Sequence, residues 1–234
     1  MLDALHDCKE AIRLVPNRQE GGAAFMAAAW AKLTGRTGIV FVTRGPGATN
    51  AAIGVHTARQ DSTPMIVFVG QVATSMRGRE AFQELDYRAT FGPLAKWAVE
   101  IESADRIPEI VARAFALAQT GRPGPVVVAL PEDVLTALTS AKAGPKVRIA
   151  RAAPEPTAVR ELERLLAQAS APLVLAGGPC WTEAARAGLR AFAESARLPV
   201  VVGFRNQDLL DNDSRSYAGD AGLGKAAHIR SLIA

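Results

Sequence analysis

The sequence places one carboxylate, Glu20, directly before the small and apolar run Gly-Gly-Ala-Ala-Phe-Met at positions 21–26. The periodicity predicts that a helix begins at Glu20, where the helix dipole favours a carboxylate that is ordinarily an exposed charge. Among small apolar neighbours, however, the same carboxylate would be shielded from water and would readily share a proton with a ring nitrogen. Glu20 is therefore a candidate catalytic acid.

A glycine-rich turn with the sequence RGPGATN follows the apolar run at residues 38–43. Open α/β sheets bind ligands at the carboxyl ends of their strands, and glycines there let the backbone approach a flat ring or a phosphate closely. The turn is not a GxxxxGK[ST] phosphate loop, and Asn50 stands where a dinucleotide fingerprint has its third glycine. Spacing alone leaves two interpretations open, a dinucleotide site and a purely structural tight turn.

Composition argues against several other classes of protein. The chain has 234 residues, 49% hydrophobic and 21% charged, as in globular proteins. Its net charge of +4 is scattered, and the densest basic cluster, at 142–151, has no interleaved aromatic residues, so we expect a linker there and no nucleic-acid partner. No apolar run approaches the roughly 18 to 20 residues of a membrane span. Two distant cysteines favour a reducing compartment, and we expect a cytoplasmic protein.

The sequence contains no motif that supports metal-dependent or hydrolase chemistry. His56 is predicted to lie within a helix with no second ligand at metal spacing, so we expect no metal ligands in this chain. Serine, histidine and aspartate are present, but no GxSxG nucleophile elbow exists. We expect Tyr87, Trp30 and Trp97 to be packing residues.

The order of elements predicts the fold class. Short apolar runs alternate with amphipathic stretches, as in parallel sheets with crossover helices. After a helical start, the pattern predicts strands at residues 12–15, 38–43, 65–69 and 125–130, and helices at 20–33, 47–59 and 106–119. The runs at 39–42 and 126–128 do not alternate, so helices should cover both faces of the sheet. We predict a doubly wound parallel α/β domain over residues 1–135.

A second domain follows a change in composition. Residues 136–155 are small, basic and proline-containing, which is typical of an interdomain linker. Helices are then predicted at 157–169 and 182–196, and strands at 173–176 and 200–202. We interpret residues 156–234 as a second, Rossmann-like α/β domain that is truncated.

Five motifs occur in a characteristic order: QEGGAAFMA at 19–27, VTRGPGATN at 42–50, DSTPMIVFVGQV at 61–72, AFQELD at 81–86 and GPVVVALPEDV at 124–134. As a set they resemble the thiamine-diphosphate enzymes of the acetolactate synthase group. Their order is similar to that of the amino-terminal, pyrimidine-binding domain of this group, without its first helix and strand. The later segments AGGP, LPVVV and YAGDAGLG are similar to its central domain.

The resemblance implies roles for particular residues. Glu20 would hydrogen-bond a pyrimidine nitrogen and favour the imino tautomer, which removes the thiazolium C2 proton. Pro46 and Asn50 would line the pyrimidine pocket, and Gln83 would reach toward the cofactor, with Phe82 beside it in the substrate pocket. The alternatives are a turn-setting Pro46, a helix-capping Asn50, and a Gln83 and a Phe82 that are ordinary surface and core residues.

The resemblance also implies an activity and partners. The complete protein would be a carboligase or decarboxylase that removes CO2 from pyruvate or a similar 2-keto acid and transfers the remaining carbanion to an acceptor. It would be a homo-oligomer. Mg2+ and the cofactor diphosphate would be held by a domain that this chain lacks, so we expect the chain alone to be inactive.

Three alternatives stay open. Some relatives bind FAD in the central domain, so Gly177-Gly178-Pro179 is a candidate nucleotide contact, with an ordinary turn as the favoured interpretation. The chain could be a truncated, non-catalytic product that binds the cofactor weakly or associates with another subunit. A dinucleotide-binding oxidoreductase is the third.

Overall fold

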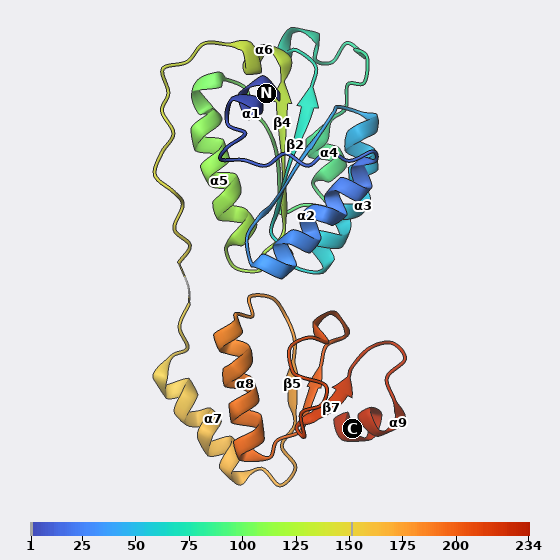
Figure 1. The fold of residues 1–234 in the computed structure, drawn as a ribbon, viewed down its shortest axis with the longest axis vertical. Coiled ribbons are helices and arrows are strands. Elements are labelled where there is room, and N and C mark those ends of the chain that lie inside the picture. Colours follow the sequence, from blue (N-terminus) through green and yellow to red (C-terminus); the bar gives the residue numbers. More distant parts are fainter. Residues whose placement is uncertain (1, 151) are drawn as a thin grey trace. The chain divides into compact units, whose positions relative to one another are not determined.

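The computed structural model describes residues 2–150 and 152–234 (Figure 1). The chain divides into two compact units between Ile149 and Ala150. This division lies within the predicted linker, and the described residues between Ala137 and Glu155 form neither helix nor strand. Among the described residues, no helix is both long and apolar enough to cross a membrane.

The first unit is built on a four-stranded parallel sheet. Its strands, in the order in which they pair, are β1 (Gly38–Val42), β2 (Met65–Gln71), β4 (Pro125–Pro131) and β3 (Trp97–Glu100). Gly38 is paired with Met65, and Met65 with Pro125, so the three long strands begin level with one another. Their carboxyl ends therefore meet at one edge of the sheet.

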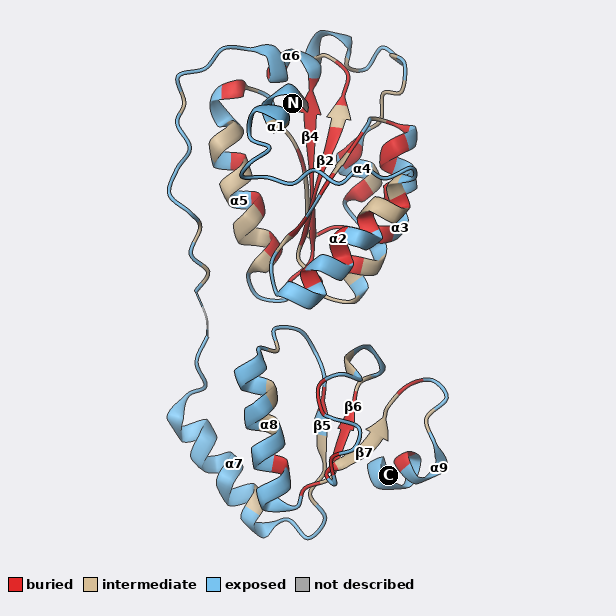
Figure 2. Cartoon of the chain, in the orientation of Figure 1, coloured by how far each residue is buried: buried red, intermediate tan, exposed pale blue. Residues whose placement is uncertain are grey.

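Helices cover both faces of this sheet. One face carries α2 (Glu20–Thr34), α3 (Pro46–Gln60) and α4 (Tyr87–Phe91), and the other carries α5 (Ile107–Gln119) and α6 (Glu132–Thr136) (Figure 1). Alternate residues of β2 face the two cores: Met65, Val67 and Val69 lie in one, and Ile66 and Phe68 in the other. Each of these five residues is buried. The neighbouring strand β4 is buried along its whole length (Figure 2). The absence of polar alternation in β2 follows from this double coverage.

The remaining elements of the first unit are short. They are α1 (Leu2–Asp7), η1 (Thr74–Met76) and η2 (Ala104–Arg106).

Small residues let α2 lie very close to its neighbours. A methyl group added at Gly54 of α3 would lie 2.4 Å from the Ala24 side chain, and one added at Gly38 would lie 2.3 Å from the Ala27 carbonyl oxygen. The amide oxygen of Gln19 accepts from the Gly22 N–H at 2.8 Å and so caps the amino end of α2. Glu20, the first residue of this helix, is thereby placed beside α3.

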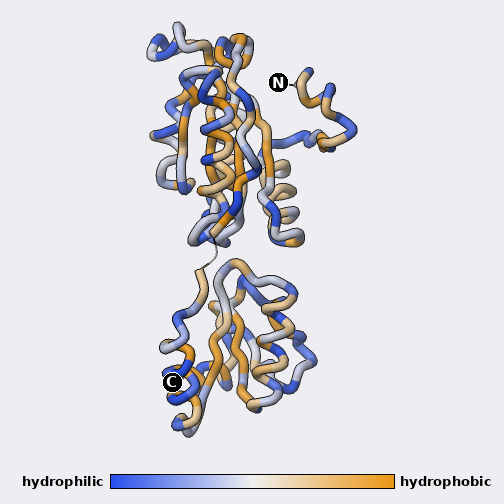
Figure 3. Tube along the Cα trace, turned by 90° about the vertical axis from the view of Figure 1, so that its left-hand side faces the viewer, coloured by the Kyte–Doolittle hydropathy of each residue, from blue (hydrophilic) through white to orange (hydrophobic). Residues whose placement is uncertain are grey.

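The second unit is a smaller parallel sheet with helices around it. Its strands pair in the order β5 (Val174–Ala176), β6 (Val200–Val202) and β7 (Tyr217–Asp220). Its helices are α7 (Pro156–Gln168), α8 (Glu183–Ala196), η3 (Phe204–Asn206) and α9 (Ala227–Ile233). The core gathers around β6 and the inward side of α8. In Figure 3, hydrophobic stretches follow the strands of both units.

The predicted fold class is confirmed, since both units are α/β with parallel sheets. One predicted strand is wrong: residues 12–15 are irregular, and Ile12, Leu14 and Val15 are about half exposed. An apolar run becomes a strand only when another strand pairs with it, and none of the described strands pairs with this one. Two strands, β3 and β7, were not predicted. Both contain four residues, too few for a clear pattern.

The close approach of α2 and α3 generates a stability prediction. We expect Gly54→Ala to lower the free energy of unfolding of the first unit by about 1–3 kcal/mol, because the methyl group overlaps Ala24. Urea unfolding followed by tryptophan fluorescence measures this. The matched control is Gly188→Ala within α8, where nothing lies within 4 Å of the added methyl group. It should leave stability unchanged or raise it by up to about 1 kcal/mol. Equal midpoints for Gly54→Ala and the wild type would contradict the close packing.

Candidate functional site

Glu20 and Asn50 meet where α2 and α3 begin. The Asn50 side-chain amide donates a hydrogen bond to Oε2 of Glu20 at 3.1 Å. The other carboxylate oxygen, Oε1, would lie 3.2 Å from a methyl group added at Gly47. Glu20 is partly exposed, so the apolar run that follows it does not bury the carboxylate as the sequence suggested. The carboxylate instead lies against the first turn of α3, with one oxygen bonded to an amide.

The turn that leads into α3 has an unusual backbone. Gly45 has φ 46° and ψ −102°, and a methyl group there would lie 2.8 Å from the carbonyl oxygen of Gln83. Only glycine suits both the positive φ and this contact. Pro46 follows as the first residue of the helix, where its fixed φ is favourable and its missing N–H costs nothing. The backbone of Gln83, from a loop almost forty residues later, therefore packs directly on this turn.

The loop that carries Gln83 is held by a carboxylate. Glu84 accepts hydrogen bonds from the N–H groups of Gly78 and Ala81, at 2.7 and 3.3 Å, and from Arg77 Nη1 at 2.7 Å. The pKa of Glu84 lies below its usual value. The hydrogen bond from the Gly78 N–H lowers it most, and the charge of Arg77 lowers it further. Arg77 also reaches Glu100 at the end of β3, with 3.1 Å between Nε and Oε1. Ion pairs of Arg77 with Glu84 and Glu100 thus link this loop to the sheet.

The structure brings four of the five predicted residues to one edge. Glu20 contacts Asn50, and Gln83 packs on the turn that contains Pro46. Gln83 itself has a left-handed backbone, with φ 66°. The side chain of Phe82 is 79% exposed, so the alternative that it is a core residue is wrong. Asn50 is not the cap of α3, because it lies in the second turn of that helix.

Two buried polar residues were missed by the sequence analysis. Tyr87, expected to be a packing residue, does pack in the core, but its hydroxyl also hydrogen-bonds the backbone at Gly45 and Gly70. Its burial raises the pKa of its phenol above the usual value. Gln71, fully buried at the end of β2, donates to the Leu85 carbonyl at 2.9 Å and to Glu100 at 3.1 Å. The sequence did offer a signal for Gln71, because it is a polar residue at the end of an otherwise apolar strand.

This edge suits a flat heteroaromatic ring. A carboxylate with one oxygen bonded to an amide can hold a single proton at a ring nitrogen. The glycines at positions 45 and 47 let the turn pack closely, since an added methyl group would meet the Gln83 carbonyl at Gly45 and the Thr43 side chain at Gly47, and Gly47 also borders the second carboxylate oxygen. These residues fit the pyrimidine of thiamine diphosphate. Among residues 2–150 and 152–234, no group of three or more His, Cys, Asp or Glu side chains is placed to hold a metal ion.

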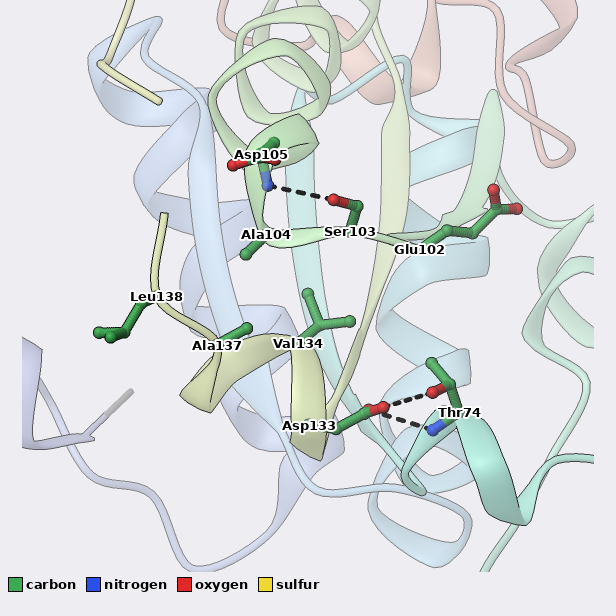
Figure 4. Close-up of a pocket in the computed structure, with 9 residues that line it drawn as sticks. All are labelled: Thr74, Glu102, Ser103, Ala104, Asp105, Asp133, Val134, Ala137 and Leu138. Carbon is green, nitrogen blue, oxygen red and sulfur yellow. Dashed lines mark hydrogen bonds between the residues drawn. The ribbon is translucent and has the colours of Figure 1, made fainter. Parts of the chain in front are cut away.

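A separate groove of about 260 Å³ lies beside η1, η2 and α6 (Figure 4). It is lined by Thr74, Glu102, Ser103, Ala104, Asp105, Asp133, Val134, Ala137 and Leu138. The carboxylate of Asp133 accepts hydrogen bonds from both the N–H and the hydroxyl of Thr74. This carboxylate therefore joins η1 to α6. None of the predicted site residues lines the groove.

In the second unit, the turn after β5 is tied down by two side chains. The amide of Asn206 donates to the Gly178 carbonyl at 3.1 Å, and the indole N–H of Trp181 donates to the Gly177 carbonyl at 3.0 Å. Gly178 has φ 80°, which favours glycine. The backbone of this turn is therefore set by contacts within the unit.

Comparison with known proteins follows the division into two units. Residues 1–90 match the family model described as the thiamine pyrophosphate enzyme N-terminal TPP binding domain, and residues 159–234 match the model of the central domain of these enzymes. The chain is 39% identical over 227 residues to the acetolactate synthase large subunit of Lactococcus lactis subsp. lactis, covering 95% of this chain and 39% of that protein. It is 37% identical over 228 residues to the acetolactate synthase isozyme 3 large subunit of Escherichia coli, covering 94% and 39%.

A third relative, the probable acetolactate synthase large subunit of Methanococcus aeolicus, is 36% identical over 228 residues, with 94% of this chain and 38% of that protein covered. The chain thus spans about two fifths of the length of the curated relatives it matches.

The carboxylate of Glu84 generates a prediction about pH. Because folding lowers the pKa of Glu84, its contribution to stability is fully present above the unfolded value, about 4.3, and is lost as the pH falls through the folded value. We expect Glu84→Gln to be less stable than the wild type at pH 7, and the difference to shrink toward pH 3. Thermal unfolding across this pH range measures it. Glu10→Gln, at an exposed position, is the control and should parallel the wild type. A difference that is constant with pH would contradict the role of the carboxylate.

Proposed function

Since this chain belongs to the thiamine pyrophosphate enzymes, we propose that its first unit holds the pyrimidine half of thiamine diphosphate, with Glu20 as the proton partner of a ring nitrogen. The contact between Glu20 and Asn50, beside the glycine turn at the carboxyl end of β1, is the observation that carries the proposal. It joins a carboxylate, an orienting amide and a closely packed glycine turn at the edge where α/β sheets bind ligands.

Each of these residues has a part in the chemistry. Thiamine diphosphate, when bound, supplies the carbon nucleophile that reacts with a keto carbon. Asn50 occupies Oε2 of Glu20 and so leaves Oε1, which faces Gly47, to hold a proton at the ring. Pro46 and the glycine before it shape the turn against which the ring lies. Gln83 and Phe82 extend from the neighbouring loop, where Phe82 is free to contact substrate.

For the complete protein we propose a carboligase or decarboxylase acting on pyruvate or a similar 2-keto acid. The support is the name of the relatives, which are acetolactate synthase large subunits. Residues beyond this chain would hold the diphosphate and Mg2+, so the chain by itself would be inactive. We place the protein in the cytoplasm. For Gly177-Gly178-Pro179 we favour a structural turn, and a flavin absorbance spectrum of the purified protein decides between that role and FAD binding.

The role of Glu20 is tested by Glu20→Gln in the complete protein. Glutamine keeps an acceptor for Asn50 but cannot exchange a proton at this site, so turnover of 2-keto acids should fall by about 10²- to 10⁴-fold. The measurement is steady-state turnover with saturating thiamine diphosphate and Mg2+. Glu109→Gln, an exposed carboxylate on the opposite face of the sheet, is the control and should retain full turnover. Wild-type turnover in Glu20→Gln would rule out the proposed role.

We also propose that a second copy of the chain covers the outer sides of α2 and α3. Five large apolar residues of these helices are exposed: Phe25 (43%), Met26 (46%), Trp30 (52%), Leu33 (87%) and Ile53 (60%). Such a group of exposed apolar residues is typical of an interface between proteins.

The double substitution Trp30→Glu with Ile53→Glu tests this interface. It should convert a dimer or larger oligomer into a monomer in sedimentation velocity, because each interface would bury two unpaired carboxylates of each copy. Leu138→Glu, at a fully exposed position, is the control and should leave the oligomer intact. An unchanged oligomer in the double variant would place the interface elsewhere.

A further inference from the structure

One buried hydroxyl joins the carboxyl ends of two neighbouring strands. The Oη atom of Tyr87 accepts a hydrogen bond from the Gly45 N–H at 2.9 Å and donates one to the Gly70 carbonyl at 3.0 Å. Gly45 lies just beyond β1, and Gly70 lies near the end of β2. Tyr87 is 1% exposed, so no water competes for these two backbone groups. A phenol can serve both because it donates and accepts at one oxygen.

The ring that carries this hydroxyl is itself fixed. Tyr87 is the first residue of α4, which is capped by Asp86 through a 3.0 Å hydrogen bond from the Ala89 N–H. Its ring lies 6.3 Å from that of Phe91, centre to centre, within the core shared by α2, α3 and the sheet. The position of the hydroxyl is therefore set by the core and by α4.

Gly45, which the Tyr87 hydroxyl holds, lies between the two sides of the proposed site. On one side, the backbone of Gln83 lies against Gly45. On the other, α3 begins directly after Gly45, and Gly47 in its first turn borders the Glu20 carboxylate. A shift of Gly45 would thus move both Gln83 and the surroundings of Glu20.

We propose that Tyr87 is a positioning residue, whose hydroxyl sets the backbone of the Gly45 turn and through it the placement of the Glu20 carboxylate. This inference rests on the proposed function of Glu20. The hydroxyl of Tyr87 bonds the backbone at Gly45 and Gly70, and its effect on Glu20 passes through the turn.

Tyr87→Phe in the complete protein tests the proposal, because it removes one oxygen and keeps the ring in the core. Two readouts are needed. In the cofactor-free protein, hydrogen exchange measured by mass spectrometry should be at least tenfold faster in peptides covering residues 43–50, and unchanged in peptides covering β4. In the loaded enzyme, kcat/KM should fall about tenfold. Tyr217→Phe, at the only other tyrosine, is the matched control and should change neither readout.

A double-mutant cycle separates positioning from general damage. If Tyr87 acts through Glu20, adding Tyr87→Phe to Glu20→Gln should lower kcat/KM by less than twofold. An equal tenfold loss in both backgrounds would overturn the proposal, as would unchanged exchange at residues 43–50. Full turnover in Glu20→Gln alone would instead refute the proposed function, and this inference with it.

Discussion

The whole edge depends on how closely α2 can approach its neighbours. Ala24 meets Gly54, and the Ala27 carbonyl meets Gly38, at distances that leave no room for a single added methyl group. Because helix axes can come this near only when small residues face one another, the run of alanines and glycines in α2 is a steric requirement. With α2 farther away, the Glu20 carboxylate would lie out of reach of the Asn50 amide.

A second layer of the architecture is polar and buried. Gln71 and Tyr87 lie near the carboxyl edge and donate hydrogen bonds to the backbone carbonyls of Leu85 and Gly70. Arg77 and Glu84 extend this layer to the loop that carries Gln83. Buried polar groups are costly unless each finds a partner, so such a network permits few arrangements of the loops above it. Apolar packing therefore fixes the positions of the helices, and the buried hydrogen bonds and ion pairs fix the conformation of the turns at the carboxyl edge.

Sequence reasoning succeeded where a pattern extends over many residues. The helices α2 and α3 and the strands β1 and β2 were predicted to within two residues at each end, because apolar periodicity and caps mark them. It failed for residues 12–15, where a short apolar run finds no strand partner. The meeting of Glu20 and Asn50 could be anticipated from two helices that begin at one edge. The roles of Gln71 and Tyr87 could not, since a polar contact formed in the tertiary structure has no periodicity.

The pairing of β3 has a consequence for the order in which the chain can fold. Among the described strands β3 pairs only with β4, which follows it by about 25 residues. The carboxylate of Glu100, at the end of β3, forms an ion pair with Arg77 and accepts a hydrogen bond from Gln71. During synthesis, the segment from α2 to β2 can therefore assemble from local contacts, whereas the loop bearing Gln83 gains its anchor only after residues 125–131 have emerged and paired. The side of the edge that carries Gln83 would therefore form after the side that carries Glu20 and Asn50.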